Sequence, residues 1–292
     1  MSSKNVFEIR SLVKSFGDNF TLGPLDLDVP RGAIFGLIGP NGAGKTTTID
    51  LMLNMGREHA GSIRLFGKHH RDDEVEIKRN IGYVSPDINL DAWGKVKRLL
   101  HYFRKFYPDW DDAYCRELLD KLDVQPEDKI RTLSFGTKIK LNLIVALAHR
   151  PDLLLLDEPT MGLDAVSRHE VFGELLKAVQ DEERTVLISS HGLADVERFA
   201  DHIGFIKEGR LLLGGETAAL VSRFRLCDYE CLNGTPSMFP DGVYPQPSEG
   251  GRMRAVIDGQ ASVDGWMKAQ HLREISNSPM NLEELFVALA KE

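Results

Sequence analysis

The amino-acid sequence predicts an α/β fold in which a mostly parallel β-sheet carries helices on both faces. Short apolar runs, each too brief for a helix, alternate with helical patterns over residues 33–213. Strands that alternate with helices in this way form a parallel sheet. A glycine-rich turn also joins the first buried run, residues 33–38, to a helix that begins at Lys45. This order of strand, loop and helix supports the same fold class.

The segments that flank this first strand and helix predict an antiparallel β subdomain. Apolar and polar residues alternate over 7–13 and again over 25–29, as in strands with one buried face. Residues 63–66 form a third such run, closed by Gly67. The parallel sheet should therefore be joined by a separate antiparallel one.

A helical insertion is predicted over about residues 88–150, after a short strand at 81–84. One helix in it follows Pro108, with Asp111 or Asp112 available as its N-cap. Its apolar residues share one face: Tyr114, Leu118, Leu119 and Leu122.

The remaining runs complete the sheet and add a small C-terminal unit. Buried strands are predicted at 153–156, 186–188 and 203–206, and a further strand at 211–213 follows the turn Glu208-Gly209. A helix between the first two is marked by Val171, Leu175 and Val179. Residues 216–292 predict an appended α+β unit, with a Pro-, Gly- and Ser-rich stretch from Asn233 to Arg252 and a last helix, Leu282 to Lys291, that Asn281 and Glu284 cap as a capping box.

Composition restricts the function classes. Lys and Arg number 36 against 44 Asp and Glu, so the chain carries a formal charge of −8 and as a whole repels nucleic acid and anionic lipid. No apolar run approaches the ~20 residues of a membrane-spanning helix, so a membrane role would need a partner. Three cysteines, Cys115, Cys227 and Cys231, without a secretory leader indicate free thiols in a reducing compartment and disfavour a zinc site.

The glycine-rich turn carries the most specific motif of the chain. It fills every position of the pattern G-x-x-x-x-G-K-S/T. Glycines let the backbone curl around a polyphosphate, so that N–H groups and the start of the next helix face the anion. Lys45 would reach the β- and γ-phosphates, and the Thr46 hydroxyl would take a place on Mg²⁺. The motif predicts a nucleoside triphosphate site made of Gly39, Pro40, Asn41, Gly42, Ala43, Gly44, Lys45, Thr46 and Thr47.

Four further motifs follow in a fixed order. The run 153–156 ends in Asp157-Glu158-Pro159, and the next buried run ends in Ser189-Ser190-His191. Between them lies Gly162-Leu163-Asp164, and before them Leu133-Ser134-Phe135-Gly136-Thr137. Taken singly, Asp157 and Glu158 can be solvated carboxylates at the end of a strand, and a lone histidine such as His191 usually has a structural role. Together, the motifs make residues 4–215 resemble the ATP-binding subunit of an ABC transporter.

The resemblance implies a P-loop, RecA-like ATPase domain over residues 1–215, with ATP and Mg²⁺ as cofactors. Residues 153–159 match the Walker B motif of this family. In it, Asp157 would hold the Mg²⁺ hydration shell, and Glu158 would orient and deprotonate the attacking water. His191 matches the switch histidine that hydrogen-bonds the γ-phosphate. Ser134 and Gly136 occupy the signature and would contact the γ-phosphate bound on a partner subunit, although Ser134 also suits a plain N-cap and Phe135 replaces a glycine.

Two positions leave alternatives open. Phe16 stands where the family carries a ring that stacks on adenine, and it can equally be a core residue. Where the family has a glutamine near Mg²⁺, this chain has Ser85-Pro86-Asp87. Asp87 can bind the Mg²⁺ hydration shell from a shifted position, or the three residues can simply form a turn and the role be missing.

The predicted function is that of an ATP-hydrolysing subunit, dimeric with itself or a related chain, that powers a separate integral-membrane permease. Residues 106–112 resemble a stretch in small bacterial exporter ATPases paired with ABC-2-type permeases, which favours export. The subunit would be cytoplasmic and peripheral on the inner membrane face, docked through the insertion by Trp93, Phe103, Tyr107 and Trp110, unless these rings belong to the core. The alternative is a soluble ABC ATPase acting on nucleic acid or ribosomes, which its acidic charge and its single cassette disfavour. A GTP switch would need an Asn-Lys-x-Asp motif, and the sequence has none.

Overall fold

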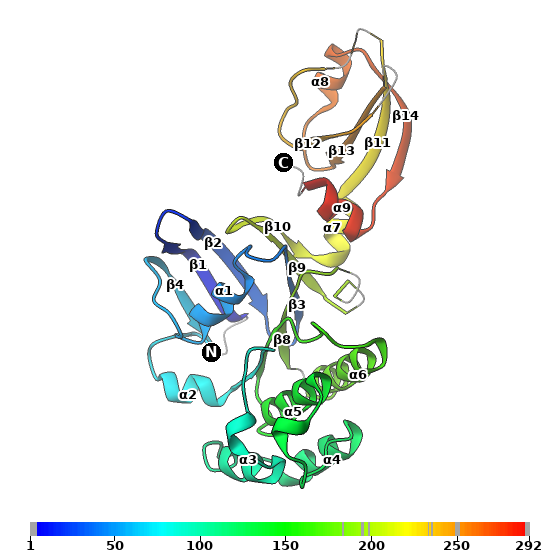
Figure 1. Cartoon of the computed structure of the whole chain (residues 1–292). Coiled ribbons are helices and arrows are strands. Elements are labelled where there is room, and N and C mark those ends of the chain that lie inside the picture. The colour runs from blue at the N-terminus through cyan, green and yellow to red at the C-terminus, as the bar shows by residue number, and fades with distance from the viewer. Residues whose placement is uncertain are drawn as a thin grey trace.

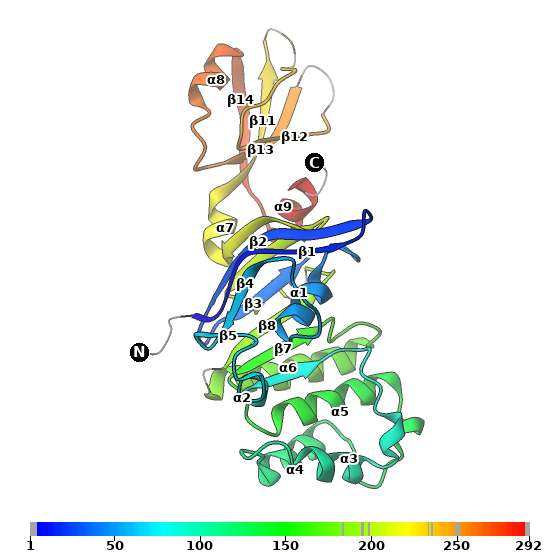
Figure 2. The same cartoon turned by 90° about the vertical axis from the view of Figure 1, so that its left-hand side faces the viewer.

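The computed structural model describes residues 5–289 except 183, 194, 195, 198, 233, 235 and 249–251, and the side chains of 174–176 and 178–182 are also outside the description. Figures 1 and 2 show three parts arranged along one long axis. Helices form one end, layered sheets the middle, and a small antiparallel sheet the other end.

The middle part is built on a six-stranded sheet in the order β10-β9-β3-β8-β7-β6. Neighbouring strands are parallel except β10, which pairs antiparallel with β9 after the turn at Glu208 and Gly209. This confirms the predicted mostly parallel sheet. The carboxyl ends of β3, β6, β7 and β8 therefore meet at one edge. The strand bounds are Ile34–Ile38 for β3, Ile81–Val84 for β6, Leu153–Asp157 for β7, Thr185–Ser190 for β8, His202–Lys207 for β9 and Arg210–Glu216 for β10.

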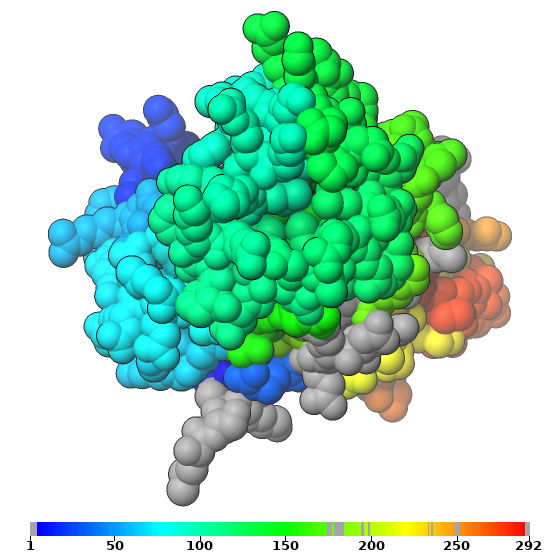
Figure 3. Space-filling model, turned by 90° about the horizontal axis from the view of Figure 1, so that it is seen from below, coloured from blue at the N-terminus to red at the C-terminus, as the bar shows by residue number. Residues whose placement is uncertain are grey.

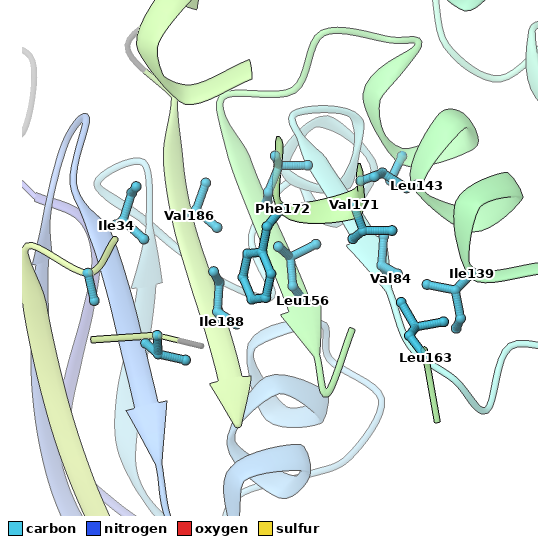
Figure 4. Packing of buried hydrophobic residues seen from close by; sticks show 14 of the residues in the cluster. Ile34, Val84, Ile139, Leu143, Leu156, Leu163, Val171, Phe172, Val186 and Ile188 are labelled. Carbon is cyan, nitrogen blue, oxygen red and sulfur yellow. The ribbon is translucent and has the colours of Figure 1, made fainter. Parts of the chain in front are cut away.

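Helices α5 (Phe135–Leu147) and α6 (Ala165–Glu182) cover one face of this sheet. Figure 4 shows the Phe172 ring of α6 among the strand residues Leu156, Val186 and Ile188. Of the residues that marked this helix in the sequence, Val171 is buried, and the side chains of Leu175 and Val179 lie outside the described residues. The alternation of buried side chains along each strand leaves a second apolar face for the opposite layer.

That second face packs against α1 (Lys45–Met52) and the predicted antiparallel sheet. The antiparallel sheet has the order β2-β1-β4-β5, with β1 at Asn5–Phe16, β2 at Phe20–Pro30, β4 at Ala60–Leu65 and β5 at Lys68–His69. Phe35 and Leu37 of β3 lie in this second core with Phe7 of β1. Burial on both faces explains why the central strands read as continuous apolar runs.

The predicted insertion consists of short helices and linkers. Its elements are α3 (Val96–Phe103), α4 (Asp112–Lys121), the 3₁₀ turns Asp91–Trp93 and Ile130–Thr132, and α5; the helix α2 (Glu74–Arg79) precedes it. Asp111 is the N-cap of α4, since one carboxylate oxygen accepts the N–H groups of Ala113 and Tyr114, each at 2.9 Å. The predicted apolar face of this helix is buried at Leu118, Leu119 and Leu122.

The C-terminal end is a four-stranded antiparallel sheet of order β12-β13-β11-β14, which confirms the predicted α+β extension. The final helix, α9, has the predicted capping box, because Asn281 and Glu284 exchange two hydrogen bonds at 2.9 and 2.8 Å. Its predicted last residue, Lys291, lies outside the described residues. The ring of Phe286 in α9 packs at a tilt against that of Phe205 in β9, with 5.2 Å between ring centres, which ties this end to the central sheet. The elements are α7 (Thr217–Arg223), β11 (Phe224–Cys231), β12 (Val243–Gln246), β13 (Arg252–Asp258), α8 (Asp264–Ala269), β14 (Leu272–Pro279) and α9 (Leu282–Leu289).

We propose residue 216, at the end of β10, as the start of the C-terminal unit.

Within the described ranges, no helix combines the length and the apolar character that crossing a bilayer requires.

Candidate functional site

The loop between β3 and α1 requires glycine at two points. A Cβ on Gly39 would lie 2.1 Å from the carbonyl oxygen of Ile206, which is closer than atoms can approach. Gly44 has a φ of 109°, in the left-handed region, and a Cβ there would lie 2.8 Å from the side chain of Leu22. Lys45 then begins α1, whose first N–H groups have no partner within the helix. The loop is therefore shaped to hold an anion against a helix N-terminus.

A hollow opens over this loop at the carboxyl edge of the central sheet. It is bounded by the loop, by the residues after β6 and by the residues after β7, because these parallel strands end at the same edge. Most of the predicted triphosphate and metal residues meet here. The lining residues are Asn41, Gly42, Gly44, Lys45, Thr46, Thr47, Pro86, Asp87, Asp157, Glu158 and Met161.

Asp157 is held from two sides at the floor of the hollow. The Thr46 hydroxyl donates to one carboxylate oxygen at 2.7 Å, and the Ser189 hydroxyl donates to the other at 2.5 Å. Ser189 also accepts the N–H of Glu158 at 2.9 Å. A hydroxyl beside a buried carboxylate provides the hard oxygen ligands that Mg²⁺ prefers, so the residues present fit this ion.

Sequence reasoning did not single out Ser189. Its hydroxyl follows directly on an apolar run, and this is the signal that could have identified it. The register of the sheet places it opposite Asp157, so it can hold the Asp157 carboxylate and the backbone of Glu158 together.

Glu158 contacts the two other predicted catalytic residues, Lys45 and His191. One carboxylate oxygen lies 3.1 Å from the Lys45 ammonium as an ion pair, and the other accepts a hydrogen bond from Nδ1 of His191 at 2.7 Å. Because an ionised carboxylate only accepts, Nδ1 must carry the hydrogen. Glu158 has a φ of 45°, an unusual conformation for a residue with a side chain. Such strained positions cluster at functional sites.

Three carboxylates lie close enough to repel one another at the hollow or next to it: Asp50, Asp87 and Asp157. Asp87 lines the hollow, and its N–H donates to the Ser85 hydroxyl at 3.3 Å in the predicted turn, so the turn leaves the carboxylate at the hollow. Burial raises the pKa of Asp50 on α1, and the negative charges of Asp157 and Asp87 raise it further. Burial and the same three carboxylates also raise the pKa of Tyr83 to about 12. A bound cation would relieve this repulsion.

Phe16 lies at the end of β1 and is 49 % exposed, so it is not a core residue. Its ring is 6.2 Å from that of Phe20, which in turn contacts the loop beside Gly44. An exposed aromatic ring can stack on a flat base.

Ser134 and Gly136 do not line the hollow. The Ser134 hydroxyl accepts the N–H of Thr137 at 3.1 Å and so caps α5. The Phe135 ring is exposed and lies against Gly162, where a Cβ would be 3.1 Å from it. In one chain, the predicted signature residues therefore lie outside the hollow over the loop 39–47.

Asp164 holds the start of α6 in the same region. Its carboxylate accepts the N–H groups of Val166 and Ser167, both at 2.9 Å, and the Ser167 hydroxyl at 2.9 Å. The hydrogen bonds from Ser167 lower the pKa of this carboxyl, with a smaller contribution from Val166. Asp164 thus fixes the loop that carries Gly162 against Phe135.

Comparison with known proteins shows which protein family the chain belongs to. Residues 22–161 match the family model of the ABC transporters. Over 288 residues the chain is 31 % identical to the ABC transporter ATP-binding protein YtrB of Bacillus subtilis (strain 168), with 97 % of each chain covered. The chain belongs to the ATP-binding subunits of ABC transporters. Like its family, this subunit binds ATP and hydrolyses it.

A further relative agrees with this ABC ATPase assignment, and a solved structure shares the fold. The Nod factor export ATP-binding protein I of Burkholderia lata is 31 % identical over 292 residues, which cover 97 % of this chain and 96 % of the relative. A solved structure described as the ATP binding subunit of an ABC transporter has the same fold, with a TM-score of 0.68 and 24 % identity over 74 % of this chain and 92 % of that one. These relatives give no support to the alternative of an ATPase that acts on nucleic acid.

Proposed function

We propose that this ABC ATPase subunit binds ATP with Mg²⁺ in the hollow over residues 39–47 and hydrolyses it to drive export through a membrane permease. The observation that carries the proposal is the contact of Glu158 with both Lys45 and His191, next to the pair formed by Asp157 and Thr46. The groups that would serve as base, as cation and hydrogen-bond donor, and as metal ligands thus lie around one loop. Phosphoryl transfer requires this set.

The contacts suggest how the residues act. The triphosphate competes with Glu158 for the Lys45 ammonium, because both are anions within reach of the same cation. Once Lys45 contacts phosphate, the freed carboxylate oxygen can accept a proton from water, and His191 can hydrogen-bond the γ-phosphate. Thr46, Asp157 and Asp87 would hold Mg²⁺, which when bound neutralises charge on the phosphates. Phe16 would stack on adenine.

A second subunit, identical or related, would complete the site. Ser134 and Gly136 stand at the N-terminus of the 13-residue helix α5, on a surface separate from the hollow. Placed over the ATP of a partner, this helix end would offer a hydroxyl, N–H groups and the positive end of its dipole to the γ-phosphate. Two ATP molecules would then join two chains.

An apolar groove between the insertion and the central sheet is the proposed docking site for the permease. Phe103 and Tyr107, two of the predicted anchors, line it, and Tyr107 stacks on His149 at 3.9 Å. Asn142 of α5 also lines it and donates to the carbonyl oxygen of Ser85 at 3.4 Å, in the turn that carries Asp87. A permease loop in the groove would therefore contact the connection to the ATP site.

The other two predicted anchors lie elsewhere. Trp93 borders a neighbouring hollow, and Trp110 packs against the core. The export direction rests on residues 106–112 and on a relative whose name specifies Nod factor export. Docking on a permease would make the subunit peripheral on the cytoplasmic face of the membrane.

Crosslinking tests the docking proposal. Met55→Cys places a thiol on an exposed side chain that lines the groove, and Val75→Cys places one on a similarly exposed apolar side chain outside it; the two native side chains are 60 % and 68 % exposed. We expect the first thiol, in membranes that contain the cognate permease, to crosslink to the permease, and the second to remain free. Equal crosslinking from both, or from Val75→Cys alone, would contradict the groove as the docking site.

Asp87→Asn tests the proposed metal role. Removing one charge from the ligand set should raise the Mg²⁺ concentration that gives half-maximal hydrolysis roughly tenfold. Asp109→Asn, at an exposed carboxylate in the insertion, is the matched control and should change nothing. A normal Mg²⁺ requirement in Asp87→Asn would leave the segment with only its role as a turn.

A further inference from the structure

A local excess of positive charge lies on α3 and the turns beside it. Residues 91–106 contain five Lys and Arg against a single Asp, in a chain whose total charge is −8. Val96, Leu99 and Leu100 bury the apolar side of α3, so its polar residues point outward. Exposed charges act over about one Debye length, roughly 8–10 Å, so this patch presents a positive surface despite the overall negative charge.

Two shallow hollows on this surface share Lys97 and Arg98 and so form one continuous area, which we name the basic face. One hollow lies between α3 and the second 3₁₀ turn, and the other lies along α3 itself. A backbone bridge between Lys95 and Lys129 joins their two segments. The basic face comprises Trp93, Lys95, Lys97, Arg98, His101, Tyr102, Lys105, Lys129 and Arg131. The carboxylate of Asp91 lies at its edge and is paired with Lys138 at 2.7 Å.

Much of this positive charge is not neutralised by the protein. Lys95 and Lys97 share the carboxylate of Glu127, at 2.7 and 2.5 Å. Four other cations of the basic face form no ion pair within the part of the chain that the structure describes: Arg98, Lys105, Lys129 and Arg131. All four side chains are exposed. The basic face is therefore free to bind anions.

Aromatic rings lie beside these cations. Trp93 contacts Tyr102 at 4.1 Å between ring centres, and Tyr102 contacts Phe106 at 4.8 Å. Tyr102 is 40 % exposed and Phe106 is 52 % exposed. Rings with one apolar and one wet side, next to Lys and Arg, are typical of surfaces that rest on lipid headgroups.

The position of the basic face suits a bilayer if the subunit docks as proposed, so this step rests on the proposed function. Phe103, on the same helix, lines the permease groove. Figure 3 looks onto this end of the molecule, where the segments around α3, α4 and α5 form the visible surface, and Figure 1 shows the C-terminal sheet at the opposite end. A permease in the groove would bring the adjoining surface towards the membrane.

We propose that the basic face binds the phosphate headgroups of anionic phospholipids on the membrane surface next to the permease. The dispersed cations and exposed rings favour a lipid surface, while the apolar groove beside them is left for the permease. The alternative partner is an acidic loop of the permease. A binding test without the permease distinguishes lipid from such a loop.

Vesicle sedimentation with the full chain, without permease or ATP, tests the proposal. Vesicles of equal parts phosphatidylglycerol and phosphatidylcholine should bind the protein, vesicles of phosphatidylcholine alone should not, and added salt should release it. The double variant Arg98→Glu with Arg131→Glu should bind anionic vesicles at least about tenfold more weakly, since each cation near such a surface adds to affinity. Arg252→Glu with Lys268→Glu changes the net charge equally on exposed residues of the C-terminal unit and should bind like the unaltered chain.

Each outcome decides the proposal. Absence of binding to anionic vesicles, equal binding to neutral ones, or equal losses in both double variants would overturn it. If the unaltered chain ignores vesicles and the basic-face variant loses only permease binding, the partner is an acidic loop and the lipid proposal is wrong. ATP hydrolysis by both variants in solution shows that they fold, and it remains as the separate test of the proposed function.

Discussion

Replacing Glu158 with Gln is expected to lower the rate of ATP hydrolysis by about 10²–10⁴-fold while leaving ATP binding intact. Gln keeps the size of the side chain and can still hydrogen-bond His191, but it cannot take a proton from water. It also removes a negative charge 3.1 Å from the Lys45 ammonium, so the triphosphate no longer competes with a carboxylate for that cation. ATP affinity should therefore be equal or higher.

Phosphate release under saturating ATP measures this prediction, and Glu208→Gln is the matched control. Glu208 also has a left-handed backbone, with a φ of 49°, but it lies in the turn between β9 and β10, outside the hollow. The control should hydrolyse ATP at the normal rate. Retained hydrolysis in Glu158→Gln would remove Glu158 from the role of base.

The Lys45→Ala variant is expected to lose ATP binding, with an affinity lower by at least about 100-fold. Lys45 is the only Lys or Arg among the described residues that line the hollow, and charged hydrogen bonds to phosphate are among the strongest in proteins. Equilibrium binding of a fluorescent ATP analogue measures the effect. A folded variant with unchanged affinity would contradict the assignment of the loop.

A second variant separates lost binding from lost folding. Lys45 and Glu158 are both largely buried, so removing the ammonium alone leaves a carboxylate without its ion-pair partner. Lys45→Ala combined with Glu158→Gln removes both charges and should unfold at a temperature close to that of the unaltered chain. It should still fail to bind ATP, because the phosphates have lost their cation.

Much of the ATP site could be predicted because its parts are local in sequence. The glycine pattern fixes the loop, and the buried runs at 153–156 and 186–188 are too short to be anything but strands. Parallel strands end at a common edge, so Asp157 and the residues after β8 had to meet near the loop. The antiparallel subdomain, the cap at Asp111 and the capping box of α9 followed from equally local rules.

The contacts that the sequence did not reveal depend on side-chain reach across strands. Ser189 binds Asp157 because β7 and β8 pair in one particular register, and no pattern in either strand specifies that register. The contact of Phe135 with Gly162 likewise joins two loops far apart in the chain. At Asp87 the sequence allowed a turn or a metal ligand, and the structure has the turn and the exposed carboxylate together.

Phe135 affects how the two subunits would meet. Its exposed ring stands between Ser134 and Gly136 and covers Gly162, so a partner chain would contact the ring as well as the phosphate donors. A bulky ring here can weaken closure when no permease holds the subunits together. Phe135→Gly removes the ring and is the variant needed to separate this effect from the role of the ATP site.

The mass of the Glu158→Gln subunit in solution, measured by light scattering with saturating ATP and Mg²⁺, tests the two-subunit ATP site most directly. Blocked hydrolysis should accumulate the closed pair, so the mass should rise from 32.7 kDa to twice that value when ATP is added. The same measurement on the double variant Glu158→Gln with Phe135→Gly shows whether the Phe135 ring prevents the pair from closing. Doubling in either variant, absent when Lys45 is also replaced by Ala, is the predicted result. A mass of one chain in both variants would contradict a site shared between two isolated subunits.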